Sequence, residues 1–358
     1  MVYLKKSGSE IVAISCSVPS RKISIKSYYN VFDKNTVDRF INNTGIDFVH
    51  RTLPNQTASD LGFEAAKRLF EKFNIPTKEV GILLFASQSP DYRKPATACV
   101  LHKRLELDTA CAAFDVNLGC SSFVYCDQII TSLLSTSEST YGLLILGETS
   151  SKLVSPNDAS TAMMFGDAGA AILYRKIDRD TTTSLLMTDG NRYTSIIVPS
   201  GGFRDMSPQK EYYISPDGKT RSKFNSYMDG VGVFSFAVTD VVNSIKDYLN
   251  KTGNSINTYD FIVLHQANEL ILTRITQKLR IPESKMLRSL KDYGNTSGVS
   301  IPLSIARHFG EQHQGIKRIL AVGYGIGLSW GICDLVINTD NVLQIIETER
   351  IYDDGIIK

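Results

Sequence analysis

Four separate features of the sequence carry groups that could take part in acyl-transfer chemistry. The first is Cys120, which follows an apolar segment and Gly119 at a point where a helical pattern begins. The free N–H groups and the dipole of a helix N-terminus favour a thiolate, so we expect a lowered pKa and a nucleophilic thiol here. The same local pattern also fits a buried structural thiol.

The other three features supply groups that an acyl transfer needs. His265 ends an apolar run in VLHQAN, and Asn295 lies in the segment DYGNTSGVS. The glycine-rich segment 321–331, AVGYGIGLSWG, would let backbone N–H groups approach a ligand oxygen closely. Taken singly, a packing histidine and a turn asparagine explain the first two better than a catalytic role does. Together with Cys120, the features provide a nucleophile, a base or hydrogen-bond donor, an amide and an oxyanion-binding backbone.

Other uses of these residue types fit the sequence less well. Papain-like proteases have the same order of cysteine, histidine and asparagine, but the C-G-[SA]-C-[WY] motif is absent around Cys120. The six cysteines form no C-x2-C pair and the five histidines are scattered, so no zinc motif is recognisable. Segment 321–331 is not followed by the helix and acidic residue of a dinucleotide-binding fingerprint. We therefore expect reduced thiols and no metal site.

Composition predicts an ordinary globular protein of about two domains. The chain has 358 residues, with 39 Lys+Arg against 37 Asp+Glu and a formal charge of +2. This balance gives no support to a protein that coats nucleic acid. No signal-peptide pattern opens the sequence and no run of 18 apolar residues occurs. We therefore expect a cytoplasmic protein that does not enter a membrane.

Alternating apolar runs and helical patterns predict an α/β fold. The predicted helices are 57–73, 97–105, 120–134, 230–250, 266–279 and 298–309. The predicted strands are 79–87, 112–118, 141–147, 168–175, 259–264, 317–323 and 331–337, with a loop-rich segment at 179–225.

The order of these elements indicates a duplication. It predicts an N-terminal half at 1–180, a C-terminal half at 181–338 and an extension at 339–358. A duplicated unit would place Cys120 and Asn295 at the starts of matching helices. In α/β folds, catalytic and binding residues often lie on the loops that follow strands. Cys120 and Asn295 would both lie at such positions.

With these motifs described, the chain resembles the β-ketoacyl-acyl-carrier-protein synthase III family of thiolase-like condensing enzymes. The matching stretches are, in chain order, FDVNLGCSSFVY, FGDAGAAIL, MDGVGVFSFAV, VLHQANELI, YGNTSGVSIPLSIA and GYGIGLSWG. The resemblance implies two similar halves in a five-layered αβαβα arrangement. It also implies a homodimer that needs no cofactor.

The resemblance further implies a two-step reaction with coenzyme A thioesters or acyl carrier protein as partners. Cys120 would take the acyl group, while backbone N–H groups of Cys120 and Ile326 hold the oxyanion. Malonyl-acyl-carrier protein would then lose CO2, with His265 and Asn295 hydrogen-bonding its thioester oxygen, and the carbanion equivalent would attack the acyl group. A family acyltransferase that passes the acyl group to an alcohol or amine, with His265 as general base, stays an alternative. A non-catalytic partner subunit would typically lack the nucleophile. The presence of Cys120, His265 and Asn295 therefore disfavours that alternative.

Three departures from the family pattern concern the donor and the carrier. Relatives that use acyl-coenzyme A carry an arginine at the position of Asn43. They carry a second arginine in the loop where this chain has Ala159 and Ser160. Leu270 replaces an arginine that helps to dock the carrier. Because lost arginines remove phosphate contacts, we expect an altered donor outside housekeeping fatty-acid initiation.

Two further expectations follow from the resemblance. Lys94, which precedes Pro95, would reach across the dimer to line the partner's acyl pocket, where relatives often carry an apolar residue. A lysine there would suit a polar or acidic acyl group, or would simply point outward. Arg274 and Lys278, four residues apart on one predicted helix, would offer positive charge to an acidic carrier, although a solvated helix face explains them equally well.

Overall fold

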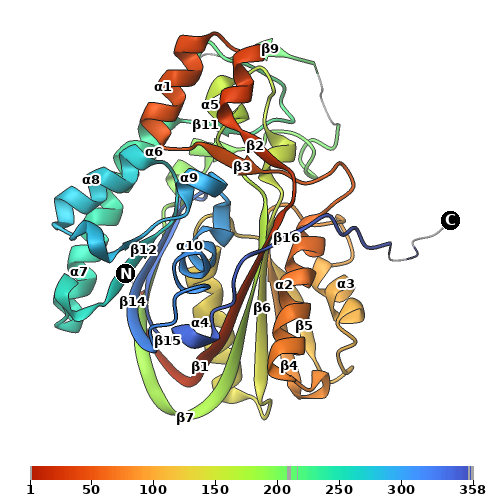
Figure 1. Cartoon of the computed structure of the whole chain (residues 1–358), viewed down its shortest axis with the longest axis vertical. Coiled ribbons are helices and arrows are strands. Elements are labelled where there is room, and N and C mark those ends of the chain that lie inside the picture. Colours follow the sequence, from red (N-terminus) through yellow and green to blue (C-terminus); the bar gives the residue numbers. More distant parts are fainter. Residues whose placement is uncertain (1, 208–210, 216, 354, 356–358) are drawn as a thin grey trace.

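Two helices lie in the middle of the molecule, with half of the sheet on either side (Figure 1). A computed structural model describes residues 2–207, 211–215, 217–353 and 355. The central helices are α4 (Ser122–Thr136) and α10 (Ser300–Phe309). Two pairs cover the outer faces: α2 (Ala58–Phe73) with α3 (Thr97–Arg104), and α7 (Val242–Thr252) with α8 (Glu269–Leu279). This stacking confirms the predicted five-layered, thiolase-like α/β fold.

The first half of the sheet has the strand order β1-β7-β6-β4-β5. Its strands are β1 (Val2–Pro19), β4 (Val80–Ala86), β5 (Ala112–Val116), β6 (Tyr141–Glu148) and β7 (Ala168–Thr188). β4 runs parallel to both β5 and β6, and Ala86 lies opposite Val116 on one side and Leu146 on the other. The residues that follow these three strands therefore gather at one edge of the sheet.

The second half repeats this pairing pattern. Its strands are β12 (Phe261–Leu264), β13 (Met286–Leu287), β14 (Ile316–Gly325) and β15 (Ser329–Asn338). β12 is parallel to β13 and β14, as β4 is to β5 and β6, and β14 is antiparallel to β15. Because α4 leads from β5 to β6 and α10 leads from β13 to β14, the central helices occupy equivalent places.

The two halves of the sheet meet along a shared strand. The first part of β7 pairs with β6, and its last residues pair with β15. Residue 180 lies inside this strand. The division of the chain at residues 180 and 338 stays a prediction, because no linker separates the halves.

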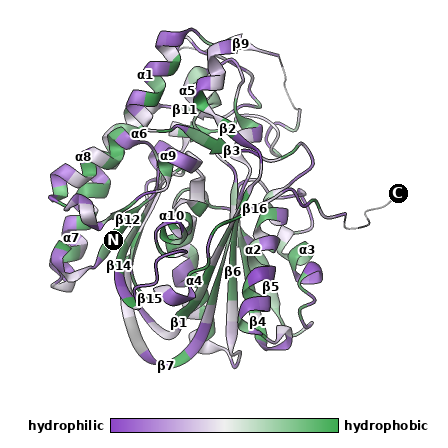
Figure 2. Ribbon diagram, viewed as in Figure 1, coloured by the Kyte–Doolittle hydropathy of each residue, from purple (hydrophilic) through white to green (hydrophobic). Residues whose placement is uncertain are grey.

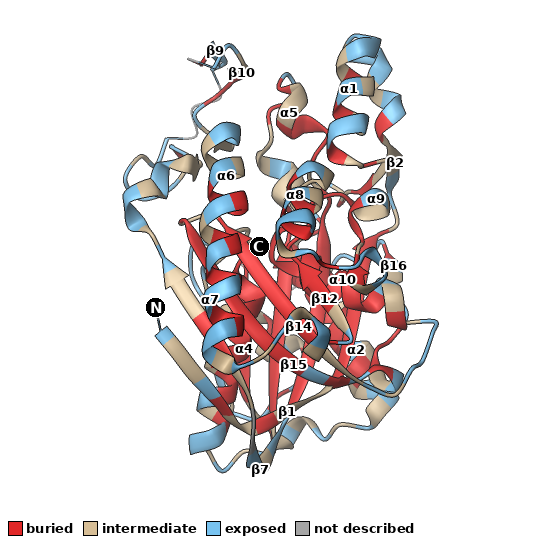
Figure 3. Ribbon diagram, turned by 90° about the vertical axis from the view of Figure 1, so that its left-hand side faces the viewer, coloured by how far each residue is buried: buried red, intermediate tan, exposed pale blue. Residues whose placement is uncertain are grey.

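Hydrophobic residues concentrate on the strands of the central sheet (Figure 2). Buried residues gather on the strands and on the central helices, whereas α7 and α8 keep an exposed outer face (Figure 3). Helix α2 shows why the amphipathic segments form where predicted: Thr57 and Asp60 make a reciprocal capping box at its start, and Asn74 ends it in the left-handed conformation.

The remaining α-helices and strands are α1 (Lys34–Thr44), α5 (Ala159–Ala162), α6 (Gly230–Phe236), α9 (Leu290–Tyr293), β2 (Lys22–Ser24), β3 (Phe48–His50), β8 (Ile196–Ile197), β9 (Tyr213–Ile214), β10 (Thr220–Arg221), β11 (Tyr227–Met228) and β16 (Ile346–Thr348). Of these, α5, α6, β8 and β11 contribute residues to the cavity that contains Cys120. No helix in the described part of the chain is long and apolar enough to cross a membrane.

Several elements differ from the prediction. The central helix begins at Ser122 and not at Cys120, because Ser121 is its N-cap. The helix predicted at 230–250 is divided by a π-helical turn at Ala237–Val241. The segment 179–225 contains the end of β7, which pairs with the start of β1, so it is not all loop. β1 itself was not predicted, since its register shifts at several bulges interrupt a regular alternation.

The C-terminal extension adds a strand to the first half of the sheet. β16 pairs in parallel with the end of β1, and Gln56 Nε2 donates to Thr348 O at 3.1 Å. The ring of Tyr352 packs edge-on against Phe63 of α2 at a centroid distance of 4.7 Å. The described part of the extension therefore lies along β1 and α2, and none of its residues lines the cavity that contains Cys120.

Candidate active site

One cavity of about 500 Å³ joins the residues that the sequence singled out. Cys120, His265 and Asn295 all line it, together with Gly325 and Ile326 of the glycine-rich segment. Cys120 precedes α4, and Asn295 precedes the short 3-10 turn Ser297–Val299 that leads into α10. The matching central helices thus bring both residues to one site, although neither residue is the first of its helix.

Cys120 occupies the turn immediately before α4. The backbone N–H of Ser122 donates to the carbonyl oxygen of Gly119 at 2.8 Å and closes this turn. The Sγ atom of Cys120 lies 3.9 Å from the Oγ atom of Ser297, which belongs to the facing helix-start segment. The nucleophile candidate therefore sits where the two halves meet.

Burial raises the pKa of the Cys120 thiol above its usual value. The Ser297 hydroxyl and the backbone N–H groups of Ile326 and Cys120 act in the opposite direction but do not offset the burial. The expectation of a lowered pKa is therefore wrong for the free chain, and the thiol is protonated at neutral pH. The two N–H groups that were predicted to hold the oxyanion both face the sulfur.

The glycine-rich strand end approaches Cys120 so closely that a side chain would not fit. A Cβ atom at Gly325 would lie 2.9 Å from the Sγ atom of Cys120. Likewise, a Cβ at Gly119 would lie 2.8 Å from the Cγ2 atom of Ile326. The glycines allow the backbone of Ile326 to reach the thiol, and oxygen binding by segment 321–331 stays a prediction.

The Ser300 hydroxyl contacts the ring of His265. The Nδ1 atom lies 2.8 Å from the Oγ atom of Ser300, and this hydroxyl accepts the Gln266 backbone N–H at 3.3 Å. In the tautomer whose Nδ1 accepts the Ser300 hydroxyl proton, the ring proton lies on Nε2 and can be donated to a substrate oxygen. Burial lowers the pKa of His265 to about 4, so the ring is neutral at pH 7. His265 is thus equipped to donate a hydrogen bond without carrying charge.

Backbone and side-chain contacts orient Asn295. Its N–H donates to Met164 O at 3.0 Å, and its carbonyl oxygen accepts from Gly166 N–H at 3.1 Å. The side-chain oxygen accepts from Ser297 N–H at 2.9 Å, so the amide nitrogen is the group left for a substrate oxygen. Donors from His265 and Asn295 therefore line the same cavity.

The residues predicted to bind a carrier lie on an outer helix. Arg274 and Lys278 are both exposed on α8, whose first turn lines the cavity through Ile271. Lys278 Nζ donates to Val238 O at 2.8 Å, and Arg274 Nη1 donates to Gln277 Oε1 at 3.3 Å. Leu270 on the same helix is exposed as well.

The other predicted substrate residues lie outside the cavity of their own chain. Lys94 and Asn43 are exposed. Ala159 and Ser160 form the start of α5, where Lys219 Nζ donates to Ser160 Oγ at 2.6 Å. Contact between these residues and substrate stays a prediction.

Two functional candidates were missed from the sequence. Glu148 ends β6 and lines the cavity with only 2% of its surface exposed, and Ser300 orients His265. The sequence does carry a signal for the first, because a carboxylate directly ends the buried run YGLLILG. Ser300 gives no such signal, because its role depends on a contact with His265 at the end of β12.

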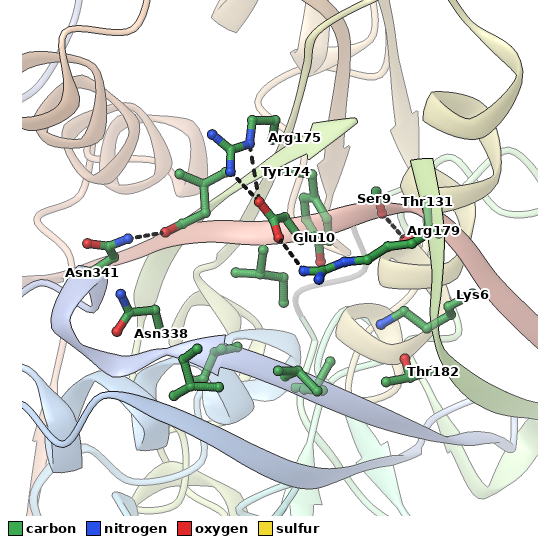
Figure 4. Close-up of a pocket in the computed structure, with 16 residues that line it drawn as sticks. Lys6, Ser9, Glu10, Thr131, Tyr174, Arg175, Arg179, Thr182, Asn338 and Asn341 are labelled. Atoms are coloured by element: carbon green, nitrogen blue, oxygen red, sulfur yellow. Dashed lines mark hydrogen bonds and ion pairs between the residues drawn. The ribbon is translucent and has the colours of Figure 1, made fainter. Parts of the chain in front are cut away.

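A second hollow, of about 290 Å³, lies between β1, β7 and β15 (Figure 4). Its charged groups pair with one another or with neighbours: Glu10 accepts from both Arg175 and Arg179, and Lys6 lies 2.7 Å from Asp127. None of the predicted site residues lines it. Across the described ranges, no cluster of three His, Cys, Asp or Glu side chains could hold a metal ion.

The fold and the site define the class: a thiolase-like, acyl-transferring enzyme. Residues 114–190 match the family described as 3-Oxoacyl-[acyl-carrier-protein (ACP)] synthase III, and residues 249–337 match its C-terminal part. A solved 3-oxoacyl-(acyl-carrier protein) synthase from Burkholderia xenovorans LB400 has a TM-score of 0.89 at 30% identity, covering 97% of this chain and 99% of that one.

Sequence relatives agree with the structural match. The beta-ketoacyl-[acyl-carrier-protein] synthase III of Clostridium perfringens strain SM101 is 32% identical over 83% of this chain and 90% of its own. That of Neisseria meningitidis strain FAM18 is 31% identical over 92% of this chain and 98% of its own. The chain belongs to the 3-oxoacyl-[acyl-carrier-protein] synthase III family and is a condensing enzyme of the acyltransferase class.

The hydrogen bond from Ser300 to His265 should matter for condensation more than for acylation. We expect Ser300→Ala to slow decarboxylative condensation by about tenfold, since one hydrogen bond to a catalytic group is worth about 1–2 kcal/mol. Cys120 acylation should change less than about twofold. Rapid-quench assays of each half-reaction measure both rates. Equal losses in the two half-reactions, or none, would contradict the assignment.

Proposed function

We propose that this enzyme forms a β-ketoacyl product by condensing an acyl group held on Cys120 with malonyl-acyl-carrier protein. The observation that carries the proposal is the meeting of four groups in one cavity: a thiol, the Ile326 N–H, a neutral imidazole and an amide donor. Each step of the reaction has a group that suits it.

The first half-reaction would acylate Cys120. The sulfur attacks the carbonyl carbon of an acyl thioester and forms a carbon–sulfur bond, while the N–H groups of Cys120 and Ile326 hold the oxyanion. The bond to the donor's sulfur then breaks, and the proton from Cys120 leaves with that sulfur as a thiol. Because the thiol is protonated beforehand, no charge has to be stored in the buried cavity between turnovers.

The second half-reaction would use His265 and Asn295. Their N–H groups donate to the thioester oxygen of the malonyl group as its carbon–carboxylate bond breaks and CO2 departs. The enolate carbon attacks the acyl carbonyl, the new carbon–carbon bond forms, and Cys120 leaves as a thiolate that regains a proton. A neutral donor suits this step, because an enolate is stabilised without a permanent buried charge.

Transfer of the acyl group to an alcohol or amine is less favoured. That reaction needs a general base to remove the acceptor's proton. His265 is the residue proposed for that role, but burial lowers its pKa to about 4, which makes it a weak base. A low pKa does not prevent the neutral imidazole from donating a hydrogen bond. The site therefore favours condensation over transfer to an alcohol or amine.

Intact-protein mass spectrometry tests the function directly. We expect acyl thioesters to add one acyl group to the wild type and to Cys99→Ala, a control that removes an exposed thiol, but none to Cys120→Ala. Malonyl-acyl-carrier protein should then discharge the adduct with release of one CO2. An adduct that alcohols or amines discharge but malonyl-carrier does not would contradict condensation.

We propose that the carrier docks beside the first turn of α8. Arg274 and Lys278 are exposed on the helix whose start lines the cavity, and carrier proteins are acidic. The missing arginines at Asn43, Ala159 and Leu270 weaken the usual contacts, which would shift the preferred donor.

Charge reversal on α8 tests this docking surface. We expect Arg274→Glu to raise the KM for malonyl-acyl-carrier protein about tenfold at low salt, with the difference shrinking as salt screens the charges. Lys72→Glu, on the distant helix α2, serves as the matched control. Equal KM values for the two variants would place the carrier elsewhere.

We propose that the enzyme works in the cytoplasm as a homodimer that pairs through β5. This strand is the free edge of the first half of the sheet, and its Phe114 keeps 38% of its surface exposed. The Asp115 carboxylate accepts the N–H groups of Thr97 and Ala98 at 2.7 Å, which fixes the segment containing Lys94 beside this edge. In such a dimer Lys94 would extend towards the partner.

A substitution on β5 tests the dimer. We expect Phe114→Lys to convert a dimeric wild type into monomers, because it places a charge in the proposed apolar interface. Ile316→Lys, at another exposed apolar position, should stay dimeric. Light scattering gives the masses. A dimeric Phe114→Lys protein would contradict pairing through β5.

A further inference from the structure

The cavity has a polar end next to Cys120. Gln88 and Asn117 follow the parallel strands β4 and β5, Glu148 is the last residue of the neighbouring strand β6, and all three residues line the cavity. They come from the first half of the chain, whereas His265 and Asn295 come from the second. An unsubstituted alkyl group would find few apolar partners at this end.

Glu148 is the central residue of this polar end. Its Oε1 atom accepts the Gln88 backbone N–H at 3.1 Å, and its Oε2 atom accepts from the Ser89 and Ser150 hydroxyls at 3.4 and 3.5 Å. Only the first of these contacts is short, so the carboxyl group keeps capacity for a further partner. Burial raises its pKa to about 8, and at pH 7 the mostly protonated group offers both a donor and an acceptor.

The neighbouring polar groups also have capacity left. In the part of the chain that the structure describes, the side-chain amides of Gln88 and Asn117 have no hydrogen-bond partner. Gln88 packs against the turn that holds the nucleophile, since a Cβ at Gly119 would lie 2.4 Å from its Oε1 atom. Ser200, another lining residue, is buried with its hydroxyl unpaired.

An acyl chain in the cavity would remove water from Glu148, which is buried, and from Gln88, which is half-buried, whereas Asn117 is exposed. A plain alkyl chain would leave the first two without new partners, whereas a hydroxyl on the chain would replace the lost water. We propose that Glu148, with Gln88 and Asn117, forms a subsite that selects acyl groups carrying a hydroxyl substituent. The inference rests on the proposed acylation of Cys120.

Paired donors test this subsite without involving a carrier. The probes are N-acetylcysteamine thioesters of butanoate and of 2-, 3- and 4-hydroxybutanoate, with the rate of Cys120 acylation followed by mass spectrometry. We expect the wild type to prefer at least one hydroxylated donor over butanoate by about tenfold. Glu148→Leu should reduce that preference to about one. Glu148→Gln, which still donates and accepts, should retain most of it.

Controls separate selectivity from general damage. Glu347→Gln changes an exposed glutamate on β16 and should behave as the wild type. Equal loss of acylation with both kinds of donor in Glu148→Leu would overturn the inference, because Glu148 would then act on the thiol or the fold. A wild type without preference would also overturn it, whatever the variants do.

The same experiment distinguishes failure of the inference from failure of the proposed function. Acylation of Cys120 by butanoate and hydroxybutanoates at equal rates would remove the subsite and leave the condensing function standing. Absence of acylation by every thioester, including coenzyme A and carrier donors, would overturn both.

Discussion

The close approach of the glycine-rich strand end to Cys120 is the constraint on which the rest of the structure depends. A Cβ atom at Gly323 would lie 3.1 Å from the carbonyl oxygen of Cys120, and one at Gly325 would lie 2.9 Å from its sulfur. These contacts join β14 of one half to the start of α4 in the other. They let the Ile326 N–H face the thiol, and no single half of the sheet could build the site alone.

Burial determines the chemistry that this arrangement can perform. It raises the pKa of Cys120 and lowers that of His265, so both groups are neutral when the cavity is unoccupied. Charge would therefore appear only during the reaction, on the oxyanion and on the enolate, where N–H donors are already in place. A site of this kind favours carbon–carbon bond formation through stabilised anions over proton removal by a base.

Much of the fold could be predicted from sequence, because the buried strands and amphipathic helices have clear periodicities and the motifs keep their order. Contacts between residues far apart in the sequence were harder to predict. The thiol pKa was predicted in the wrong direction, since helix-start N–H groups are visible in a sequence whereas the burial that outweighs them is not. β1 was missed because its bulges break the alternation, although it pairs with β7 over most of its length.

The site shows the same division between local and distant information. Cys120, His265 and Asn295 could be named from their motifs, and the structure brings them to one cavity. Glu148 has a local signal in the carboxylate that ends a buried run, whereas the role of Ser300 depends on its contact with His265 across the fold. The proposed roles of Lys94, Arg274 and Lys278 depend on contacts with a partner subunit or a carrier.

The most direct test of the account is a crystal structure of the enzyme acylated on Cys120, trapped in the variant His265→Ala so that condensation cannot follow. The account predicts a thioester whose carbonyl oxygen lies about 3 Å from the backbone nitrogens of both Cys120 and Ile326. A carbonyl oxygen turned away from these two N–H groups, or an acyl group on another residue, would contradict it.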